Sequence, residues 1–302
     1  MSNILVTGVA GFIGSEIAKK LLLLSHEVYG IDDLSIGYQK NIPQGVNFIE
    51  ADLSKPSSLK KIPKGIDVVF HLSGQSSGEV SFEDPIQDLK KNTHSTLNLI
   101  SFIKENNVQK IIYASSMSVY GDVEDSPIKE DHPLIPLSCY GVGKLSSENY
   151  LRIMLPKTNV VVMRMFNVYG PGQDLKNLKQ GMVSIYLSQA INTGTIEVKG
   201  SLDRWRDFIF IDDVVSAWVK ALNTNLIGHS VFNLGSGKKT HVKELIKEIK
   251  KNFQSINISI SNGTPGDQKG IFSDNSKIKE SLGIKTFTSL EDGIKKFYKW
   301  SM

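Results

Sequence analysis

The chain has one cysteine among its 302 residues, so no disulfide can form within it. This residue, Cys139, adjoins Tyr140, but no histidine lies near it in the sequence, and we interpret it as a small spacer rather than a nucleophile. Long hydrophobic runs are missing as well. The leucines at positions 21–24 form a run far too short to cross a bilayer, so we expect no membrane association.

Blocks of like charge are also absent. The formal net charge is only +4, and no cluster of lysine and arginine with interleaved aromatic residues occurs, which argues against a nucleic-acid partner. The strand-like sequence from residue 3 onward leaves no room for a charged leader and an apolar signal segment, and we therefore expect a cytoplasmic protein. Hydrophobic residues make up 40% of the chain, enough to build a sizeable core.

Arginine is scarce, with only four in the chain, and the other basic residues are lysines. Two of the four, Arg204 and Arg206, lie two positions apart in the sequence DRWRDF. A guanidinium group is a planar fork that can bind two phosphate oxygens at once, which lysine cannot do. We interpret both arginines as candidate phosphate ligands, with a salt bridge inside the protein as the alternative.

Strands and helices alternate along the sequence. Continuous apolar segments, typical of parallel strands that helices cover on both faces, occur at residues 4–7, 27–31, 46–50, 67–72, 110–114 and 160–164. Segments with helical spacing occur at residues 12–24, 85–105 and 140–154. A closing helix is expected near residues 289–300, where Thr288 and Glu291 have the spacing of a capping box. This order predicts an α/β fold with a doubly wound parallel sheet of the Rossmann type.

The pattern changes after residue 166, where loops rich in glycine, proline and asparagine begin. We therefore divide the chain into a dinucleotide-binding Rossmann domain at residues 1–166 and a smaller C-terminal α/β substrate-binding lobe, formed mainly by residues 167–302. Two later strands, near residues 207–212 and 230–235, are expected to return to the sheet of the first domain.

Three glycines, Gly8, Gly11 and Gly14, lie between the first strand and the first helix. Glycine allows a tight turn and the close approach of a pyrophosphate, and the helix N-terminus then offers free N–H groups to the phosphates. Asp32 ends the next strand 18 residues after Gly14, where a carboxylate binds the adenosine ribose hydroxyls and repels a 2′-phosphate. Since no basic residue is near Asp32 in the sequence, the pattern predicts NAD rather than NADP as cofactor, and no metal site.

The sequence YGVGK places Tyr140 and Lys144 four residues apart, on one face of a predicted helix. Oxidation of a sugar hydroxyl requires a base, and a tyrosine has an ordinary pKa of about 10. A nearby ammonium group, together with a positively charged nicotinamide ring, favours the phenolate and so lowers that pKa. Ser116 follows a buried strand at the sheet edge where such folds bind ligands, and its hydroxyl can share the proton. We predict that these three residues are catalytic.

Further motifs follow these in a consistent order along the chain: TGVAGFIG, IDDLSIG, ADL, VFHLSGQSS, SFEDP, ASSMSVYG, YGVGK, RMFNVYGPGQ, RDFIFIDDV, FNLGSG and PGD. By these motifs the sequence resembles the extended short-chain dehydrogenase/reductases, in particular the NAD-dependent epimerase/dehydratase family of UDP-glucose 4-epimerase-like nucleotide-sugar enzymes. The resemblance implies that Tyr140 is the base, that Lys144 anchors the cofactor ribose and that Ser116 contacts the substrate hydroxyl. It also implies that the cofactor is bound by Phe12, Ile13, Asp52, Leu53, Leu72, Ser73, Gly74 and Asn92.

Dehydratases of this family carry an Asp-Glu pair just after the residue that matches Ser116. Met117 and Ser118 occupy those positions here, and neither side chain can do the acid/base work of eliminating water. Three activities remain open: a 4-epimerase acting through a transient 4-keto sugar, a keto-sugar reductase, and a dehydrogenase that releases an oxidised sugar. We favour the epimerase. The intact set of Ser116, Tyr140 and Lys144 argues against a non-catalytic NAD(H) sensor.

The resemblance also implies that the substrate is a nucleotide-diphosphate sugar, and we expect a UDP-sugar. Asn167 and Arg206 match family positions that contact the diphosphate, and an amide and a guanidinium group suit phosphate oxygens. Relatives often have an arginine just before PGD, where this chain has Thr264. Either Arg204 replaces that contact, or the diphosphate lies differently.

Two other positions near the expected site are unusual or open to two interpretations. Gly143 stands where the family usually has a serine, and it loosens the predicted helix slightly. Glu79 lies in a segment expected near the sugar, where it could be a second acid/base group. We favour the simpler interpretation, an exposed glutamate.

Relatives pair through two helices that form a four-helix interface, and the matching segments here are residues 85–105 and 140–154. We therefore predict a homodimer with twofold symmetry. The apolar residues that could form this interface, or alternatively face the sheet, are Leu97, Ile100, Leu151 and Met154.

Overall fold

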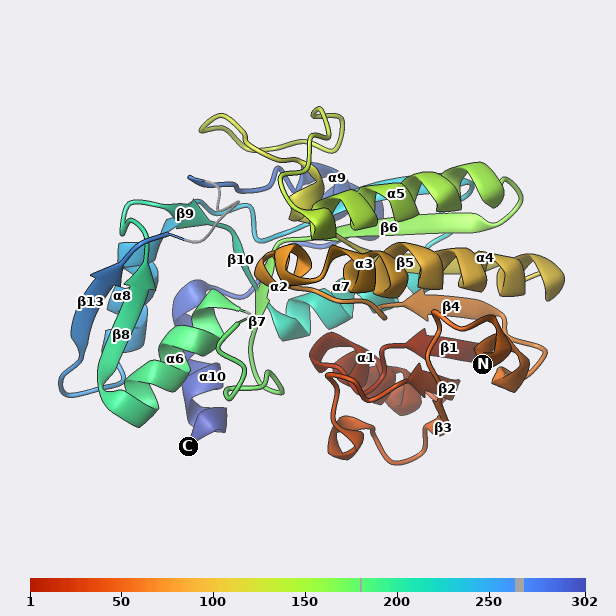
Figure 1. Cartoon of the computed structure of the whole chain (residues 1–302), viewed down its shortest axis with the longest axis horizontal. Helices are drawn as coiled ribbons and strands as arrows, with labels where there is room; N and C mark the ends of the chain where they lie inside the picture. Colours follow the sequence, from red (N-terminus) through yellow and green to blue (C-terminus); the bar gives the residue numbers. More distant parts are fainter. Residues whose placement is uncertain (180, 264–268) are drawn as a thin grey trace.

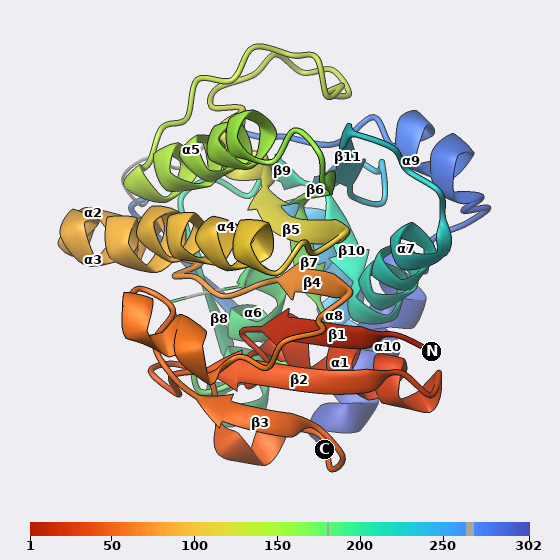
Figure 2. The same ribbon diagram turned by 90° about the vertical axis from the view of Figure 1, so that its right-hand side faces the viewer.

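The computed structural model describes residues 1–179, 181–263 and 269–302. Within these ranges the main sheet has seven strands in the order β11-β6-β5-β4-β1-β2-β3, and all neighbours are parallel (Figures 1 and 2). The order reverses between β1 and β4, which confirms the predicted doubly wound fold. The strands are β1 (Asn3–Thr7), β2 (Glu27–Asp32), β3 (Asn47–Glu50), β4 (Val68–His71), β5 (Lys110–Ser116), β6 (Asn159–Met165) and β11 (His229–Leu234).

Helices cover both faces of the main sheet (Figure 2). In β1, the side chains of Ile4, Leu5 and Val6 are all fully buried. Ile4 and Val6 belong to one apolar cluster and Leu5 to the other, as the alternation of side chains along a strand requires. The helices of the first face are α1 (Phe12–Leu23) and α7 (Ile211–Asn223), and those of the second are α4 (Ser95–Glu105) and α5 (Cys139–Met154).

The helix predicted at residues 85–105 is divided in the structure. Asp84 starts a new helix because its side chain accepts a hydrogen bond from the backbone N–H of Gln87 at 2.9 Å, and a proline follows it. A π-helical turn then interrupts the helix and carries Asn92, which is buried. In chain order the segments are α2 (Gly78–Glu83), α3 (Pro85–Leu89), the π turn η3 (Lys90–His94) and α4.

Two short strands pair beside the main sheet. β7 (Asn167–Tyr169) is parallel to β10 (Phe208–Phe210), so the prediction that a strand near residues 207–212 returns to the main sheet is wrong. The strand predicted near residues 230–235 does join the main sheet, as β11, and pairs with the edge of β6. Because β11 occupies that edge, β10 pairs instead with β7. Strand β7 follows β6 in the chain, with only Phe166 between them.

The smaller lobe lies beyond one end of the main strands (Figure 1). Its strands β8 and β13 pair in parallel, and β9 and β12 form a short antiparallel pair. The remaining described elements are η1 (Gln39–Asn41), η2 (Pro56–Lys61), η4 (Met117–Val119), α6 (Met182–Thr193), β8 (Thr195–Lys199), β9 (Trp205–Arg206), β12 (Thr240–His241), α8 (Val242–Lys250), β13 (Asn257–Ser261), α9 (Ser276–Leu282) and α10 (Leu290–Ser301).

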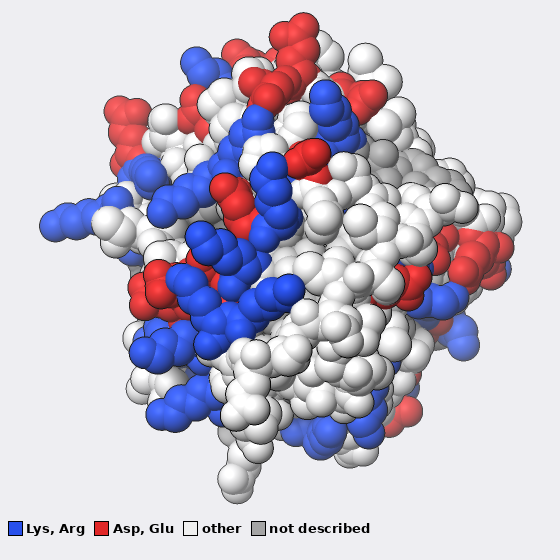
Figure 3. Space-filling model, turned by 90° about the vertical axis from the view of Figure 1, so that its left-hand side faces the viewer, with Lys and Arg blue, Asp and Glu red and all other residues white. Residues whose placement is uncertain are grey.

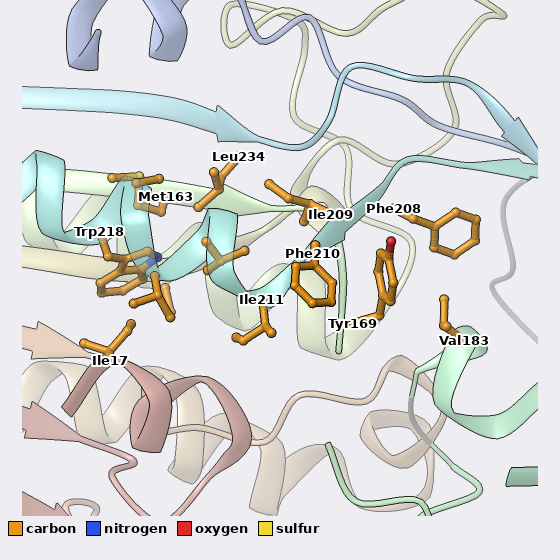
Figure 4. Close-up of a cluster of buried hydrophobic side chains, with 14 of the residues drawn as sticks. Ile17, Met163, Tyr169, Val183, Phe208, Ile209, Phe210, Ile211, Trp218 and Leu234 are labelled. Atoms are coloured by element: carbon orange, nitrogen blue, oxygen red, sulfur yellow. The ribbon is translucent and has the colours of Figure 1, made fainter. Parts of the chain in front are cut away.

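One apolar cluster continues from the main sheet into the lobe (Figure 4). Met163 of β6 and Trp218 of α7 lie at its sheet end, and Val183 of α6 lies at its lobe end. Between them, the rings of Tyr169 and Phe210 pack with their centroids 5.6 Å apart and nearly edge to face. The two parts therefore share a core, and this places the lobe firmly at one edge of the sheet.

The closing helix, α10, is capped one residue later than the sequence predicts. The Ser289 hydroxyl accepts a hydrogen bond from the Asp292 backbone N–H at 3.1 Å and donates one to the Asp292 carboxylate at 2.6 Å. The backbone N–H of Thr288 donates instead to Asp213 of α7, at 2.7 Å. The predicted capping box of Thr288 and Glu291 is therefore wrong, because Thr288 is used to attach the helix to its neighbour.

Lysines on the outer face of the lobe have acidic residues among them (Figure 3). Lys243 pairs with Asp203 at 2.8 Å, and Lys251 pairs with Glu248 at 2.7 Å. Exposed pairs of this kind contribute little to stability, but they balance the basic charge locally. Within the described ranges, no helix has both the length and the apolar sequence needed to cross a membrane.

Two of the four apolar residues predicted at a dimer interface belong to the core. Ile100 of α4 and Leu151 of α5 are fully buried and pack against the sheet, so the alternative placement is the correct one for them. Leu97 and Met154 are half-buried. An interface on these helices must therefore do without Ile100 and Leu151.

Candidate active site

The turn between β1 and α1 depends on its glycines. Gly8 has a φ of 72°, and its N–H donates to the carbonyl of Ile31 at 2.8 Å. A Cβ on Gly14 would overlap the Gly8 carbonyl oxygen. Gly11 caps α1 without a side-chain hydrogen bond, and Phe12 and Ile13 begin the helix. The free N–H groups of this helix start therefore form a site suited to a pyrophosphate.

Asp32 lies at the end of β2, and backbone groups hold its carboxylate. Oδ2 accepts a hydrogen bond from the Ala10 N–H at 3.0 Å, and Oδ1 accepts one from the Leu34 N–H at 2.9 Å. Burial raises the pKa of this carboxyl, while these two hydrogen bonds oppose the rise. The carboxylate is therefore fixed beside the glycine turn, as the sequence predicts.

A lysine that the sequence reasoning missed pairs with the residue that follows Asp32. Lys91 forms an ion pair with Asp33 and a second one with Asp52, whose Oδ2 lies 3.1 Å from the lysine Nζ. Leu53, the neighbour of Asp52, is 4% exposed and belongs to the core beneath. Lys91 comes from the π turn, far along the chain from Asp32, so no local pattern could reveal it. Its charge is balanced by two carboxylates.

The segment after β4 forms a second wall of the site. The backbone N–H groups of Leu72 and Ser73 both donate to the hydroxyl oxygen of Thr7, at 3.1 and 3.0 Å. Gly74 has a φ of 150°, and a Cβ there would overlap Oδ1 of Asn92. The chain must therefore be glycine at this position to bring Asn92 against it.

Asn92 carries a buried acceptor that the protein leaves unused. Its Nδ2 donates to Asp88 at 3.0 Å, but no donor among the described residues reaches its Oδ1. Buried acceptors are normally satisfied, so this oxygen marks a place for a donor such as a hydroxyl group. Together with the glycine turn, it shows that a dinucleotide with ribose hydroxyls and a pyrophosphate fits the residues present.

Tyr140, Lys144 and Ser116 come together at this edge of the sheet. Ser138 caps α5 by accepting a hydrogen bond from a backbone N–H at 3.1 Å, and the helix carries the tyrosine and lysine one turn apart. The Lys144 Nζ donates to the carbonyl of Ala114 at 2.9 Å and lies 5.7 Å from the centre of the Tyr140 ring. Ser116 ends β5 and hydrogen-bonds to the Tyr140 hydroxyl. The predicted trio is thus one cluster.

Burial dominates the protonation of these groups. It raises the pKa of Tyr140 to about 12, although the hydrogen bond from Ser116 acts in the opposite direction. It lowers the pKa of Lys144 to about 8, while the charges of Asp88 and Glu148 oppose that fall. The low tyrosine pKa expected from the sequence is therefore not a property of the protein alone, because the cost of burying a phenolate outweighs the local hydrogen bond.

A buried network fixes α5 behind the site. Glu148 of α5 binds Arg164 of β6 through two hydrogen bonds of 3.1 and 2.8 Å, and it also accepts one from Ser115. Arg164 donates to the Tyr120 hydroxyl at 3.0 Å, and that hydroxyl donates to Asn233 of β11 at 2.6 Å. The network ties α5 to three parts of the sheet edge, and it was not predicted because its members are far apart in the sequence.

The residues that replace the dehydratase acids lie directly beside Ser116. Met117 and Ser118 belong to the short turn η4, and the hydroxyl oxygens of Ser116 and Ser118 lie 3.2 Å apart. Asn167, at the start of β7, reaches the Met117 sulfur at 3.6 Å and donates to the carbonyl of Asp207 at 3.0 Å. The structure therefore places Asn167 next to the predicted catalytic cluster.

Both predicted phosphate-binding arginines lie in the lobe. Arg206 is 5% exposed, and burial together with the charge of Arg204 lowers its pKa to about 10. Arg204 is half-buried and donates to the carbonyl of Ser201 at 3.2 Å. The charge of Arg204 acts on the Arg206 guanidinium, and two neighbouring guanidinium groups suit one anionic ligand. Thr264 and the PGD sequence after it lie outside the described residues.

Residues 171–179 form a segment that contacts the loop after β2 and the helix α2. At one end Asp174 accepts a hydrogen bond from the Tyr38 hydroxyl at 3.1 Å. At the other end Lys179 pairs with Glu83 of α2 at 2.9 Å. Glu79, in the first turn of α2, is half-buried on this side, and no contact among the described residues joins it to Tyr140.

Comparisons with known proteins agree with this geometry. The model of the NAD dependent epimerase/dehydratase family matches residues 4–235. A putative UDP-glucose 4-epimerase of Methanocaldococcus jannaschii is 34% identical over 98% of this chain and 97% of that protein.

Two solved structures are similar over 99% of this chain and 98% of their own. The Thermotoga maritima UDP-glucose 4-epimerase with UDP-glucose has a TM-score of 0.94 at 32% identity. The Bacillus cereus UDP-glucuronic acid 4-epimerase with UDP-glucuronic acid and NAD has a TM-score of 0.89 at 30% identity.

Proposed function

The chain belongs to the NAD dependent epimerase/dehydratase family, and from this premise we propose that it is an NAD-dependent 4-epimerase of UDP-sugars that acts through a transient 4-keto sugar. The observation that carries the proposal is the cluster of Ser116, Tyr140 and Lys144 at the same sheet edge as the glycine turn. Beside it, Met117 and Ser118 supply no acid or base for the loss of water.

The cofactor side of the site supports NAD. Gly8, Gly11 and Gly14 would lie under the pyrophosphate, and the Asp32 carboxylate would bind the adenosine ribose. Lys144 would hold the nicotinamide ribose, close to the unused oxygen of Asn92. When bound, NAD would supply the hydride acceptor for C4 of the sugar and the donor that returns the hydride. A 2′-phosphate would face the carboxylate of Asp32, which disfavours NADP.

In this mechanism Tyr140 removes the proton of the C4 hydroxyl group and later returns it. Its hydroxyl must be ionised to remove the proton of the C4 hydroxyl, and Ser116 shares that proton through the hydrogen bond between the two side chains. Lys144 places an ammonium group near the phenol, and the positive charge of an oxidised cofactor would add to it. The same phenol then returns the proton to C4 oxygen at the end of the reaction.

The lobe would hold the part of the substrate that does not react. Arg206 and Arg204 bring two guanidinium groups together, and Asn167 offers an amide between the lobe and the catalytic cluster. Binding the diphosphate there would leave the sugar free to turn and present its other face. This division between a fixed diphosphate and a mobile sugar is what an epimerase requires.

The competing activity is a reductase or dehydrogenase with net hydride transfer. Both activities use the same three residues, so they differ in whether NADH accumulates or is consumed. The test is to incubate the purified protein with UDP-, dTDP-, GDP- and CDP-sugars and to record product identity and NADH together. A C4 epimer without net NADH supports the proposal, whereas a change in NADH equal to the product formed supports the alternative.

We also propose that two copies pair through α2, α3 and α5, which lie side by side (Figures 1 and 2). These helices expose large apolar side chains, whereas Ile100 and Leu151 are used in the core. Exposed large apolar side chains on neighbouring helices are typical of a binding interface. The exposed residues are Phe82, Ile86, Leu89, Val142, Tyr150 and Ile153.

A further inference from the structure

A buried carboxylate of α3, Asp88, lies beside the site and has no role in the mechanism above. Its side chain is only 2% exposed, and its Oδ1 accepts the hydrogen bond from Nδ2 of Asn92 at 3.0 Å. That bond fixes the orientation of the Asn92 amide, because the amide nitrogen must face the carboxylate. The unused oxygen of Asn92 is thereby directed toward Gly74, and the Nζ of Lys144 lies within 3.5 Å of the point where a Gly74 Cβ would be.

The second oxygen of Asp88 faces α5 at Gly143. A Cβ at Gly143 would lie 3.4 Å from Oδ2 of Asp88 and 3.3 Å from the Cβ of Asn92, so a small side chain needs only a slight adjustment. Within the described part of the chain, no donor reaches this oxygen. A serine at position 143 would carry a hydroxyl to it. Glycine leaves the carboxylate with one hydrogen bond and one nearby cation.

The charged and titratable groups around Asp88 come from several elements. Lys144 of α5 stabilises the carboxylate, and the carboxylate in turn raises the pKa of Lys144 and that of Tyr140. Burial is the larger effect and raises the pKa of Asp88 to about 6. Tyr113 of β5 faces the same space with its pKa raised by burial, and His71 of β4 stays neutral because burial lowers its pKa to about 3.

The other carboxylate near Lys144, that of Glu148, belongs to the buried network behind the site. Glu148 is held by Arg164 at 2.8 Å and by further hydrogen bonds, so its charge is compensated within its own network. Among the residues that the structure describes, no cation forms an ion pair with Asp88. Its second oxygen therefore lacks the compensation that Arg164 gives to Glu148.

We propose that Asp88 is a positioning residue, which holds Asn92 and balances the Lys144 ammonium, and that Gly143 leaves the second oxygen of its carboxylate without a donor among the described residues and open to a proton. The inference rests on the proposed function, since it assumes that the nicotinamide end of NAD binds beside Lys144. The ring of NAD⁺ is positively charged and that of NADH is neutral. Protonation of Asp88 leaves the lysine charge uncompensated, so it weakens the binding of NAD⁺ more than that of NADH.

The matched test compares Gly143→Ser with Gly143→Ala, because both add a Cβ and only serine adds a donor for Asp88. The dissociation constants of NAD⁺ and NADH are measured by fluorescence titration at a series of pH values. In the wild type and in Gly143→Ala, the NAD⁺ constant should rise about tenfold as the pH falls through about 6. In Gly143→Ser the midpoint should move down by about one pH unit, the effect expected of a hydrogen bond to a charged group.

Asp88→Asn should abolish the midpoint, and the ratio of the two dissociation constants should then be independent of pH in this range. A merely structural role would weaken binding equally at every pH. The inference would be overturned, and the proposed function left standing, by either of two results. One is that the NAD⁺ dissociation constant depends on pH in the same way in Gly143→Ser and Gly143→Ala, and the other is that the midpoint persists in Asp88→Asn. Failure of the wild type to bind NAD at any pH would overturn the proposed function and this inference with it.

Discussion

At the scale of single residues, burial and hydrogen bonding act on the Tyr140 hydroxyl in opposite directions. Burial raises its pKa to about 12, and the bond from Ser116 only partly offsets this. Lys144 is buried as well, and its own pKa is lowered to about 8. The phenolate therefore needs additional positive charge before it forms near neutral pH. An oxidised nicotinamide ring would bring that charge, so the base becomes active only together with the oxidant.

Tyr140→Phe removes this base and leaves the ring in place. Its kcat at saturating substrate should fall by roughly 10²–10⁴-fold, the usual contribution of a positioned proton-transfer group, with a smaller effect on substrate binding. Steady-state kinetics with the cofactor bound measures this. The NAD dissociation constant of the variant serves as the control for an intact site. Turnover within about threefold of wild type would contradict the role given to Tyr140.

The carboxylate of Asp32 should decide between the two dinucleotides. We expect the wild-type protein to bind NAD(H) at least about tenfold more tightly than NADP(H), equivalent to about 1.4 kcal/mol. Asp32→Ala should narrow this gap because the variant no longer repels a 2′-phosphate. Equilibrium titration of both cofactors gives the ratio. Lys91 is a nearby cation that could attract a 2′-phosphate, but Asp33 and Asp52 neutralise it. Equal affinities of the wild type for NAD(H) and NADP(H) would contradict both this neutralisation and the role of Asp32.

Residues that share a local spacing were predictable from the sequence, and residues that meet across long distances were not. Tyr140 and Lys144 are one helical turn apart, so their proximity follows from helix geometry. Lys91 reaches Asp52 only because the π turn and the sheet order bring them together. Asp88 lay within a predicted helix, but nothing in its local pattern indicated that it would be buried.

At the scale of elements, Asp207 joins three segments of the lobe. Its carboxylate accepts hydrogen bonds from the backbone N–H and hydroxyl of Ser236 at 2.7 and 2.6 Å, and from those of Ser273 at 3.1 and 2.6 Å. Gly237 adds a further N–H at 3.0 Å. The start of β10, the turn after β11 and the segment before α9 are therefore held by one side chain.

Asp207→Ala should leave these buried donors without an acceptor. The free energy of unfolding should fall by about 3 kcal/mol or more, since each unsatisfied buried group is costly. Urea unfolding measures it. The control is Asp203→Ala, an exposed residue just before β9 that pairs with Lys243, and it should change the unfolding free energy little. Equal effects of the two substitutions would contradict the structural role of Asp207.

The sequence pattern predicted which segments are helices and strands better than it predicted their partners. The strand near residues 207–212 exists, but periodicity does not say which edge it joins, and β11 already occupies the edge of β6. The division of the helix at 85–105 had a visible signal in Asp84 and Pro85, which together start a helix. The π turn had none.

At the scale of the whole molecule, pairing through α3 and α5 can be tested directly. Ile153 of α5 is 63% exposed on the proposed interface, and Ile153→Asp would bury a charge there if two copies pair. Light scattering at micromolar concentration should show a dimer for the wild type and a monomer for this variant. Ile227→Asp, at a 78% exposed position in the loop before β11, should remain a dimer. A monomeric wild type would contradict the proposal.

The shared core explains why the two parts of the chain act together. Tyr169 and Phe210 pack between the main sheet and the lobe, so the two arginines proposed to bind the diphosphate keep a fixed position relative to Tyr140. The doubly wound order was predictable because apolar strands alternate with helices in the first half. The arrangement of the lobe was harder to predict, because its strands are short and partly exposed. Four of the five residues of β13, for example, are exposed.

The central claim is that hydride leaves C4 of the sugar and returns to the same carbon. The most direct measurement uses the UDP-sugar that the protein converts, prepared with deuterium at C4, and follows the label by mass spectrometry and NMR. The proposed mechanism predicts that deuterium stays at C4 in both epimers, with no net change in NADH. Loss of the label to solvent, or its appearance in free NADH, would contradict the mechanism.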